Sequence, residues 1–361
     1  MHDADSVYLA LIKVVGIGGC GTNAVNHMVE VGLRGVEFVV VNTDKQSLLM
    51  SEADTQVHIG RDLTRGLGAG SDPDVGREAA EESREEIKQA LVGGDMVFIT
   101  CGEGGGTGTG AAPLVAEIAK KEIGALTVAV VTRPFGFEGR KRAQIAEEGI
   151  RRLREHVDAL IVVPNDRLLA VANKNTTHEE AFQMADDVLR QGIQGITELI
   201  QMPGKINLDF ADVRTILRDA GSCVMGIGLA TGDDRAVDAT RAAISSPLLE
   251  ATIKGARGVL LAIAAGSDLT ITEIAAAADL VREAAASPDE NVIFGLTIDD
   301  SMPEGQVRVT VVAAGFQGGE RRQDALFAAA AGETEAGAPV PVFEAVTDDD
   351  FEEPPFLKGH V

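Results

Sequence analysis

Cysteine, long apolar runs and basic charge are all scarce in this sequence. Its three cysteines, Cys20, Cys101 and Cys223, are widely spaced and form no C-x-x-C pair. They are too few to cross-link a chain of 361 residues, which favours the reducing cytoplasm. No uncharged apolar run reaches the ~18 residues that a membrane span needs, so no span is expected. The first residues are acidic rather than basic, so no signal peptide is expected.

The balance of charge narrows the classes of partner. The chain has 32 basic and 56 acidic residues, which gives a formal net charge of −24. That charge repels phosphate backbones and anionic lipid headgroups, so we expect neither nucleic-acid binding nor direct membrane insertion. A nucleoside triphosphate is not excluded, because backbone N–H groups and a bound cation can overcome an unfavourable field locally.

Two common kinds of site are missing from the sequence. It contains no G-x-x-x-x-G-K-[ST], so it offers no P-loop lysine to the terminal phosphates of a nucleotide. Its histidines form no cluster with cysteines or paired carboxylates, so no structural zinc is expected. A phosphate site in this chain must therefore use backbone amides and Mg²⁺.

The first half of the chain has the pattern of a doubly wound parallel sheet. A hydrophobic content of 45% in 361 residues is enough for two domains. From Leu11 to about Asn173, short β-branched runs alternate with helical stretches. Nearly continuous apolar character predicts strands buried on both faces at Val36–Val41, Met96–Thr100, Leu126–Thr132 and Leu160–Val163.

A long helix and a second α/β region follow. Apolar residues at helical spacing predict one helix over Thr176–Met202, which Pro203 and Gly204 end. Beyond it, strands are expected at Val224–Ala230, Gly258–Ala264, Val292–Ile298 and Val307–Val312, and helices near Arg235–Ile244 and Ile271–Glu283. The segment Gln317–Val361 has ten acidic and three basic residues, and it buries too little apolar surface to fold alone.

Two glycine-rich segments each lie between a strand and a helix, where phosphates bind. The first, Gly16–Asn23, lets the backbone approach a phosphate closely, but its G-x-G-x-x-G pattern also fits a dinucleotide site. The second, Gly104–Gly110, has five glycines in seven residues and precedes a helix with Pro113 in its first turn. Its position after a buried strand argues against a flexible linker.

These segments resemble the tubulin and FtsZ superfamily. Gly104–Gly110 matches its glycine-rich signature, and Gly18–Asn23 resembles its first phosphate loop. Further matches occur in the order of the family: Asn42–Asp44, Thr64–Gly70, Thr132–Phe135, Phe137–Arg142, Asn207–Asp212 and Ser245–Leu249. The likeness spans Lys13–Phe316 and is stronger to FtsZ than to eukaryotic tubulin. Cys20 and Cys101 stand where FtsZ proteins usually carry Gly or Ala.

The resemblance implies that this chain binds GTP or GDP together with Mg²⁺, with the metal held through phosphates and water rather than by side chains. The implied nucleotide contacts lie in both glycine segments and beyond them: Gly19, Cys20, Gly21, Thr22, Asn23, Gly70, Gly104, Gly105, Gly106, Thr107, Gly108, Thr109, Gly110, Glu138, Arg142, Asn165, Phe182 and Asp186. Gly70 belongs to the loop Gly68–Pro73, which resembles the family's γ-phosphate sensor. As a sequence alone, that loop also suits an ordinary turn.

Pairs four residues apart on a helix support these contacts but have ordinary explanations too. Phe182 can stack on a purine, and Asp186 can accept two N–H bonds from a guanine edge, which adenine does not offer. Without the family, Phe182 as core and Asp186 as solvated surface would be the simpler interpretation. Glu138 and Arg142 would likewise form a surface ion pair.

Asn207, Asp209 and Asp212 follow the long helix and open another. Asp209 can be an N-cap, and Asp212 is favourable in a first helical turn. The family implies instead that this loop enters the nucleotide pocket of the next subunit, where the two carboxylates orient and polarise the attacking water. Splitting the site across an interface would couple hydrolysis to assembly.

The implied fold is α/β and tubulin-like: a Rossmann-type, parallel-sheet GTPase domain joined by a long central helix to a second α/β domain, with a disordered C-terminal tail. We expect these segments: a flexible N-terminus 1–10, a GTP-binding domain 11–175, a central helix and start of the synergy loop 176–206, a GTPase-activating domain 207–316, a disordered linker 317–347 and a partner-binding peptide 348–361.

The implied function is a cytoskeletal GTPase of the division (Z) ring at the future septum. Subunits would stack head to tail into a homopolymer, because a heterologous contact that does not close generates a filament. Phe351–Lys358 resembles the peptide that docks on membrane-tethering division proteins, although an inert terminus is the alternative. The expected location is the cytoplasm, concentrated at midcell.

Two other functions compete with this one. A Rossmann oxidoreductase would use Gly16–Gly21 with Asp44 as the ribose acid, but Asp44 is farther along than the usual ~20 residues and the second glycine segment stays unexplained. A tubulin-like scaffold that binds nucleotide without hydrolysis, or that serves cell shape, is the third. Asp209 and Asp212 argue against lost hydrolysis but leave the cellular role open.

Overall fold

A computed structural model describes residues 10–170, 172–173, 175–201, 209–246, 249, 251–286, 291–298, 302–303 and 305–316. The chain divides into two compact units, Met1–Gln317 and Gly318–Val361, and every described residue belongs to the first. The predictions for residues 1–9, for Asn207 and for the tail from Gln317 lie outside the described residues.

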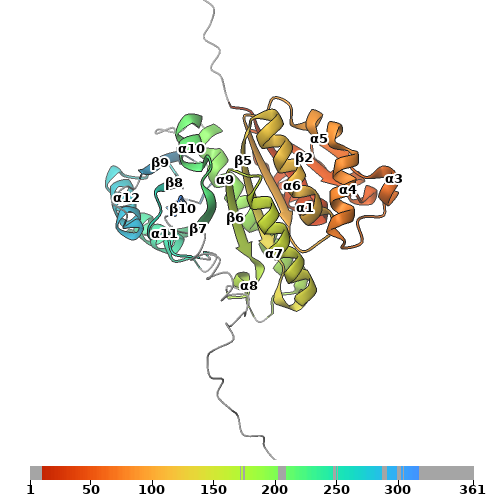
Figure 1. The fold of residues 1–361 in the computed structure, drawn as a ribbon. Coiled ribbons are helices and arrows are strands. Elements are labelled where there is room, and N and C mark those ends of the chain that lie inside the picture. The colour runs from red at the N-terminus through yellow and green to blue at the C-terminus, as the bar shows by residue number, and fades with distance from the viewer. Residues whose placement is uncertain are drawn as a thin grey trace, which may run out of the picture. The chain divides into compact units, whose positions relative to one another are not determined.

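The N-terminal half contains a parallel sheet, as the sequence predicts (Figure 1). Its strands are β1 (Ile12–Ile17), β2 (Val36–Asn42), β3 (Thr55–His58), β4 (Met96–Gly102), β5 (Leu126–Arg133) and β6 (Ala159–Pro164). They lie in the order β3-β2-β1-β4-β5-β6, and every neighbouring pair is parallel. Sequence analysis missed β3, because Val57 is its one buried residue among polar neighbours.

Helices cover both faces of this parallel sheet. They are α1 (Gly18–Val31), α2 (Lys45–Leu49), α3 (Arg61–Thr64), α4 (Pro73–Glu82), α5 (Arg84–Leu91), α6 (Thr107–Glu117), α7 (Arg140–Arg154) and α8 (Asn165–Leu168), with a π-helical turn η1 (Ile118–Ile123) and a 3₁₀ turn η2 (Gly136–Glu138). Apolar residues of α4, α5, α6 and α7 form the core on one face, and those of α1 share the core on the other.

The C-terminal half is a mixed rather than a purely parallel sheet. Its elements are β7 (Gly221–Thr231), α11 (Arg235–Ile244), β8 (Gly258–Ala265), α12 (Ile271–Ala285), β9 (Asn291–Ile298) and β10 (Gln306–Ala314). β10 runs antiparallel to both β7 and β8. A short parallel pairing of β6 with β7 continues the two halves into one ten-stranded order.

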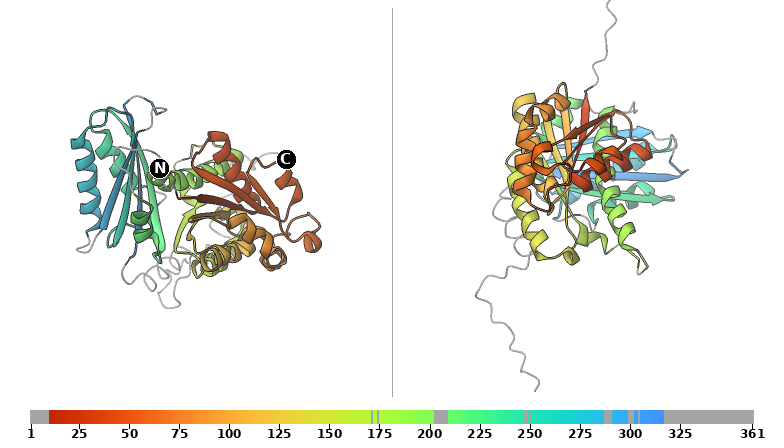
Figure 2. Two further views of the ribbon diagram at one scale, coloured as in Figure 1. Left: turned by 90° about the horizontal axis from the view of Figure 1, so that it is seen from above. Right: turned by 90° about the vertical axis from the view of Figure 1, so that its right-hand side faces the viewer.

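The long helix α9 (His178–Gln201) lies between the two halves, as Figure 2 shows from above. Its buried side chains, with those of α1 and α10 (Phe210–Leu217), join residues of both halves of the sheet in one core. A separate core lies under α11 and α12 on the far face of the C-terminal half. No helix in the described part of the chain combines the length and apolar character that a membrane crossing requires.

Helix α11 packs against β7 at backbone distance. A Cβ built on Gly228 would lie 2.0 Å from the carbonyl oxygen of Ala239, and one on Gly226 would lie 2.0 Å from that of Ala243. Real Cβ atoms do not approach backbone oxygen so closely, so these two glycines set how near α11 can come to the sheet.

Gly228→Ala should therefore destabilise the C-terminal half. The added methyl must push α11 outward and loosen a closely packed core, which costs about 2 kcal/mol or more of unfolding free energy. Denaturant unfolding of the full chain measures this. Leu229→Ala is the control, because Leu229 is the next residue and is 53% exposed. Equal stability of the two variants would contradict the packing described here.

Candidate functional site

A cavity of about 480 Å³ lies at the carboxyl ends of the parallel strands. Ile17, Gly102 and Thr132, at the ends of β1, β4 and β5, form part of its wall. Ligands of open parallel sheets bind at this edge. A second hollow, of about 560 Å³, lies over the amino ends of β1 and β2, where Lys13 already pairs with Glu37 at 2.8 Å. The first cavity gathers the chemistry that the sequence predicts.

Each of the two helices starts inside its glycine segment, which corrects the prediction that the helices start after these segments. α1 starts at Gly18 and α6 at Thr107, so Pro113 is in the second turn of α6 rather than the first. Neither helix has a side-chain N-cap or an acidic residue in its first turn. The free N–H groups and the positive ends of two helix dipoles therefore meet at one cavity, which suits an anion.

Several other helices of the described chain have a side-chain N-cap. Asp44 caps α2, Asp72 caps α4, Asp209 caps α10 and Thr270 caps α12, each by accepting a backbone N–H. Five further helices among the described residues, α3, α5, α7, α8 and α11, also begin without a side-chain cap, so it is the meeting of two uncapped starts at one cavity that marks the site.

Glycines at the cavity serve two different purposes. A Cβ on Gly18 would lie 2.9 Å from the amide nitrogen of Gly108, so glycine lets the two segments touch through their backbones. A Cβ on Gly19 or Gly105 would meet no atom within 4 Å. Since both residues line the cavity, the missing side chains leave room there for a ligand.

Most of the predicted nucleotide contacts line this cavity: Gly19, Cys20, Asn23, Gly105, Gly106, Thr107, Gly108, Glu138, Arg142, Asn165, Phe182 and Asp186. Six others lie beside its wall: Gly21, Thr22, Gly70, Gly104, Thr109 and Gly110. Two of these brace the segments, since Thr22 Oγ1 donates to the Gly18 carbonyl at 2.8 Å and Thr109 Oγ1 accepts from the Gly104 amide at 2.9 Å. The contact of all these residues with a nucleotide stays a prediction.

Another part of the cavity wall, formed by Asn165 and residues of α9, combines an aromatic ring with polar acceptors. Phe182 is 41% exposed and stands edge-on to Phe135, with ring centroids 5.4 Å apart. Asn165 is 4% exposed, and its Oδ1 has no hydrogen-bond partner among the described residues. Burial raises the pKa of Asp186 to about 7, although a weak bond from Cys20 Sγ opposes the rise. These acceptors suit a ligand that donates N–H bonds.

Glu138 and Arg142 pair with each other across one helical turn, as their spacing predicts. Glu138 also accepts the backbone N–H of Phe135 at 2.9 Å. The pair therefore holds η2 against the start of α7 at the rim of the cavity, and both side chains line it. A structural ion pair and a ligand contact are compatible here.

Several residues of the wall were not named individually as nucleotide contacts, although Gly18 and Ser71 belong to predicted phosphate loops: Ile17, Gly18, Ser71, Gly102, Glu103, Thr132, Pro134 and Ala185. Most directly follow strand ends or neighbour predicted contacts, and that position was the signal available for them. Ser71 has a φ of 62° and belongs to the predicted γ-phosphate loop. A non-glycine residue in this left-handed region is strained, as at many functional sites.

Glu103 is the least expected member of the wall, because it is a buried carboxyl beside an anion site. It is 4% exposed, and its Oε2 has no partner among the described residues. Burial raises its pKa to about 7, and the charge of Glu147 adds to the rise. A Cβ on Gly149 of α7 would lie 2.3 Å from Oε2, so glycine is what leaves room for this carboxyl.

The predicted catalytic acids lie apart from the cavity of their own chain. Asp209 Oδ1 accepts the backbone N–H of Asp212 at 2.8 Å, so Asp209 is the N-cap of α10. The N-cap role that the spacing predicts for Asp209 is therefore observed, and Asp212 lies in the first turn of α10. Neither residue lines the cavity.

Asp44 does not have the position that the oxidoreductase alternative requires. Its carboxylate accepts the backbone N–H groups of Gln46 and Ser47 and the hydroxyl of Ser47, all at the start of α2. It does not line the cavity. The residue named as a ribose acid is instead a helix cap.

Comparison with known families matches both halves of the chain. Residues 11–173 match the GTPase domain of the tubulin/FtsZ family, and residues 221–317 match the C-terminal domain of the FtsZ family. The first match covers all of the cavity wall except the residues of α9, and the second covers β7 to β10.

Solved structures give the same result. An FtsZ dimer from M. jannaschii is 46% identical, with a TM-score of 0.82 over 86% of this chain and 90% of that one. A mutant form of M. jannaschii FtsZ is 47% identical, with the same TM-score over 86% and 92%. CetZ2 from Haloferax volcanii, solved as a GTPgS-bound protofilament, is 22% identical, with a TM-score of 0.75 over 89% and 97%, and shares the fold.

The buried carboxyl of Glu103 predicts a pH-dependent contribution to stability. Its folded pKa of about 7 exceeds the ordinary 4.5, so the folded state binds more protons between these values. The contribution of Glu103 to the free energy of unfolding is then greatest below pH 4.5. It falls as the pH rises through 7, by about 3 kcal/mol at most. Glu103→Gln, which mimics the protonated acid, should remove this loss.

Thermal unfolding of wild type and Glu103→Gln between pH 5 and 8 measures the effect. The variant should gain stability relative to wild type as the pH rises. Glu155→Gln is the control, since its side chain is 64% exposed and pairs with Arg151 at the surface. A constant difference between wild type and Glu103→Gln across this range would disprove the prediction.

Proposed function

This chain belongs to the FtsZ family of the tubulin/FtsZ superfamily, and we propose that it is a self-polymerising cytoskeletal GTPase that forms the division (Z) ring at the future septum. In this proposal, GTP is bound in the cavity of one subunit and hydrolysed at its contact with the next. The observation that carries the proposal is the separation of the two parts of the site. Two uncapped helix starts share one cavity, whereas Asp209 and Asp212 lie on α10, away from it.

The phosphates would bind at the starts of α1 and α6. Backbone N–H groups of Gly19–Gly21 and Gly105–Gly108 supply the donors, and the two helix dipoles favour the negative charge. Among the described residues no three His, Cys, Asp or Glu side chains are grouped to hold a metal. Mg²⁺ would therefore be ligated by the phosphates and water, and its charge would neutralise that of the phosphates.

The base would lie beside Asn165, Phe182 and Asp186 of the cavity wall. Asp186, when ionised, accepts the two N–H groups of a guanine edge, and the free Oδ1 of Asn165 accepts another donor. Phe182 offers its exposed ring as a stacking surface. An adenine presents a different donor pattern to Asp186, so GTP is preferred over ATP.

Hydrolysis would require the next subunit. Asp209 and Asp212, together with Asn207 outside the described residues, orient and polarise a water in line with the γ-phosphate. The capping bond from the Asp212 amide to Asp209 holds the first of these carboxylates in place and leaves the side chain of Asp212 available. A free monomer therefore binds GTP but turns it over slowly, and assembly completes the site.

The remaining parts of the proposal concern assembly and location. The M. jannaschii relative is a dimer and the Haloferax volcanii relative a protofilament, which supports head-to-tail assembly of this chain. We place the filaments in the cytoplasm at midcell. Phe351–Lys358 would dock on membrane-tethering division proteins, with residues 317–347 as the linker.

Assembly and turnover should rise together. With Mg²⁺ and GTP, light scattering and phosphate release should both appear above one threshold protein concentration, and ATP should support neither. Asp212→Ala should assemble but lose ~100-fold or more of its turnover, because it removes an acid that acts only at the interface. Turnover per molecule that does not depend on protein concentration would sink the shared-site mechanism.

Guanine recognition by Asp186 should depend on pH. Guanine donors bind the ionised carboxylate, whose pKa in the free protein is about 7, so GTP affinity should fall as the pH drops from 8 to 6. Asp186→Asn should bind GTP ~100-fold or more weakly and lose this dependence. Fluorescence titration with a labelled guanine nucleotide measures both.

Xanthosine triphosphate provides the matched probe for the same variant. Its base offers one donor and one acceptor at this edge, which an asparagine amide complements. Asp186→Asn should therefore prefer xanthosine triphosphate to GTP. If wild type and variant bind both nucleotides alike, Asp186 does not read the base.

A further inference from the structure

The π-helical turn η1 is an irregular continuation of α6 on the side away from the cavity. α6 ends at Glu117 and runs into η1 without a break, and Gly124 in a left-handed conformation ends it. Ile118 and Ala119 are fully buried, so the turn is anchored in the core. π-Helical turns are rare and often occur at functional sites. The charged residues that follow, Lys120, Lys121 and Glu122, point to different neighbours.

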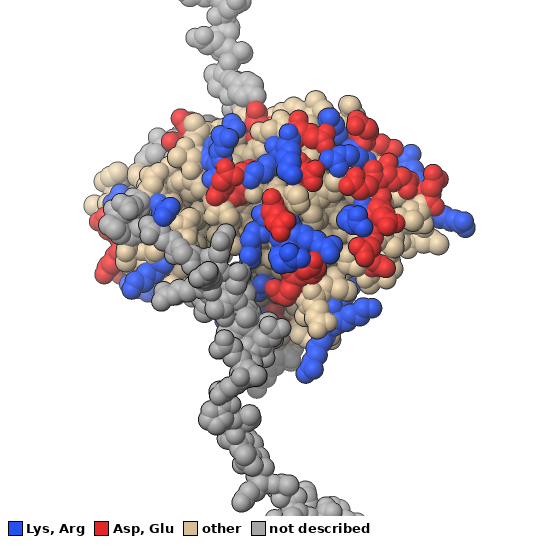
Figure 3. Space-filling model, in the orientation of Figure 1, with Lys and Arg blue, Asp and Glu red and all other residues tan. Residues whose placement is uncertain are grey.

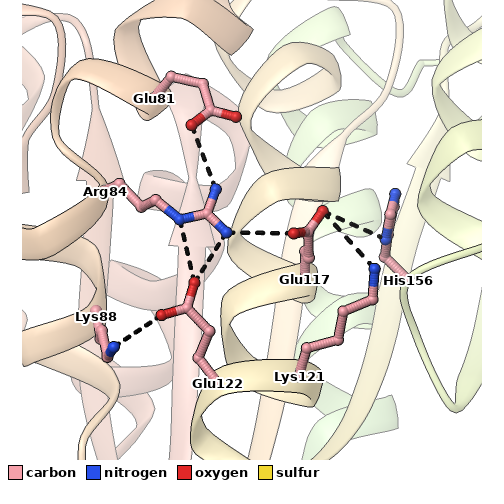
Figure 4. Close-up of polar contacts among 7 residues, drawn as sticks. All are labelled: Glu81, Arg84, Lys88, Glu117, Lys121, Glu122 and His156. Carbon is pink, nitrogen blue, oxygen red and sulfur yellow. Dashed lines mark hydrogen bonds and ion pairs between the residues drawn. The ribbon is translucent and has the colours of Figure 1, made fainter.

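One side of η1 is tied to α5 by an ion-pair network, shown in Figure 4. Glu122 accepts from Arg84 and Lys88, each at 2.8 Å, and Arg84 also reaches Glu81 and Glu117. Acidic and basic side chains lie side by side over this face in Figure 3. The network fixes η1 against its neighbouring helix, so Lys120 extends from a rigid base.

Lys120 reaches the opposite way and uses all three of its ammonium hydrogens. Its Nζ lies 3.0 Å from the Val157 carbonyl, 3.0 Å from Asp158 Oδ1 and 2.8 Å from Asp219 Oδ1. Lys121, the next residue, pairs among the described residues with Glu117 alone, at 4.0 Å, and its side chain is 61% exposed. The two lysines therefore have very different environments.

Asp158, one of the partners of Lys120, also bonds to β5, to the connection after α10 and to the start of β7. It is 5% exposed, and its Oδ2 accepts the Thr127 amide of β5 at 2.9 Å. Its Oδ1 accepts the Asp219 amide at 3.3 Å, and its carbonyl accepts the Gly221 amide at the start of β7 at 2.9 Å. Removing Lys120 would leave this buried carboxylate without its cation.

Asp219 belongs to the short connection from α10 to β7. Its φ of 50° is left-handed, a conformation that costs ~1 kcal/mol or more outside glycine. α10 ends at Leu217 and β7 begins at Gly221, so holding Asp219 holds the end of α10. α10 has eight residues and is ~12 Å long, with Asp209 and Asp212 at its start. A shift at one end of so short a helix is transmitted to the other.

We propose that Lys120 is a positioning residue for GTP hydrolysis, which fixes the end of α10 through Asp158 and Asp219 and so aims Asp209 and Asp212 at the nucleotide of the neighbouring subunit. This inference rests on the proposed function, because it needs hydrolysis by those two acids. Val213, Ile216 and Leu217 bury one face of α10 and keep the helix docked without the clamp. Lys120 then restricts its remaining freedom to slide or rotate.

The test compares Lys120→Met with Lys121→Met in the full-length protein. Lys120→Met should bind GTP and form filaments at the wild-type threshold, but turnover per assembled subunit should fall about tenfold, as a small misplacement of catalytic groups predicts. Lys120→Arg, which keeps the charge, should recover part of the activity. Lys121→Met should match wild type in all three measurements.

A merely structural role would give a different result. Lys120→Met would then lower GTP affinity, filament mass and thermal stability together, and turnover per assembled subunit would stay at the wild-type value, which overturns the proposal. If Lys120→Met does not fold, Asp219→Asn decides, since the Asp219 side chain is 69% exposed and the change removes the charge that strengthens the link between Lys120 and the end of α10. It should lower turnover about threefold with assembly intact, and wild-type turnover would overturn the proposal.

Failure of this inference differs from failure of the proposed function. If wild type assembles and hydrolyses GTP, Asp212→Ala does not hydrolyse it, and Lys120→Met is as active as wild type, only the role of Lys120 is wrong. If wild type itself shows no assembly-dependent GTP turnover, the proposed function fails and the role of Lys120 with it.

Discussion

Two helices that begin without a cap at the same cavity are the constraint on which the rest of this structure depends. The first turns of α1 and α6 expose backbone N–H groups that no side chain of the described chain satisfies. Leaving such donors unpaired is unfavourable, and the contact of Gly18 with Gly108 shows that the two segments are packed together through their backbones. Larger residues at these positions would separate the helices. The sheet, the glycines and the polar wall are arranged around donors that an anion can complete.

The sequence predicted the regular elements well, because their patterns are local. Strands such as Val36–Val41 are recognisable from uninterrupted apolar residues, and the long helix from its 3.6-residue spacing. The prediction that two helices start after the glycine segments was wrong, because they begin at Gly18 and Thr107. Glycine disfavours helix locally, and only the packing of one segment on the other makes it helical here. Strand β3 was missed because its pairing with β2, rather than its composition, defines it.

The wall of the cavity was only partly predictable for the same reason. Gly19, Phe182 and Asp186 belong to motifs with a chemical rationale, whereas Glu103 enters the wall because β4 ends there and Gly149 leaves space for it. No spacing in the sequence relates Lys120 to Asp158 and Asp219, which meet only through the fold. Contacts made across elements far apart in the chain leave no periodic pattern to detect.

The π-helical turn also has a consequence for how this protein can vary. A wider turn holds one more residue than an α-helical turn of the same rise, so η1 takes up a difference in length between the two structures that it joins. The register of α6, which starts within the second glycine segment, is thereby separated from the register of β5. A change in length on one side of Ile118–Ile123 therefore need not shift the other side, and the turn separates the helix that begins at the cavity from the strand that follows.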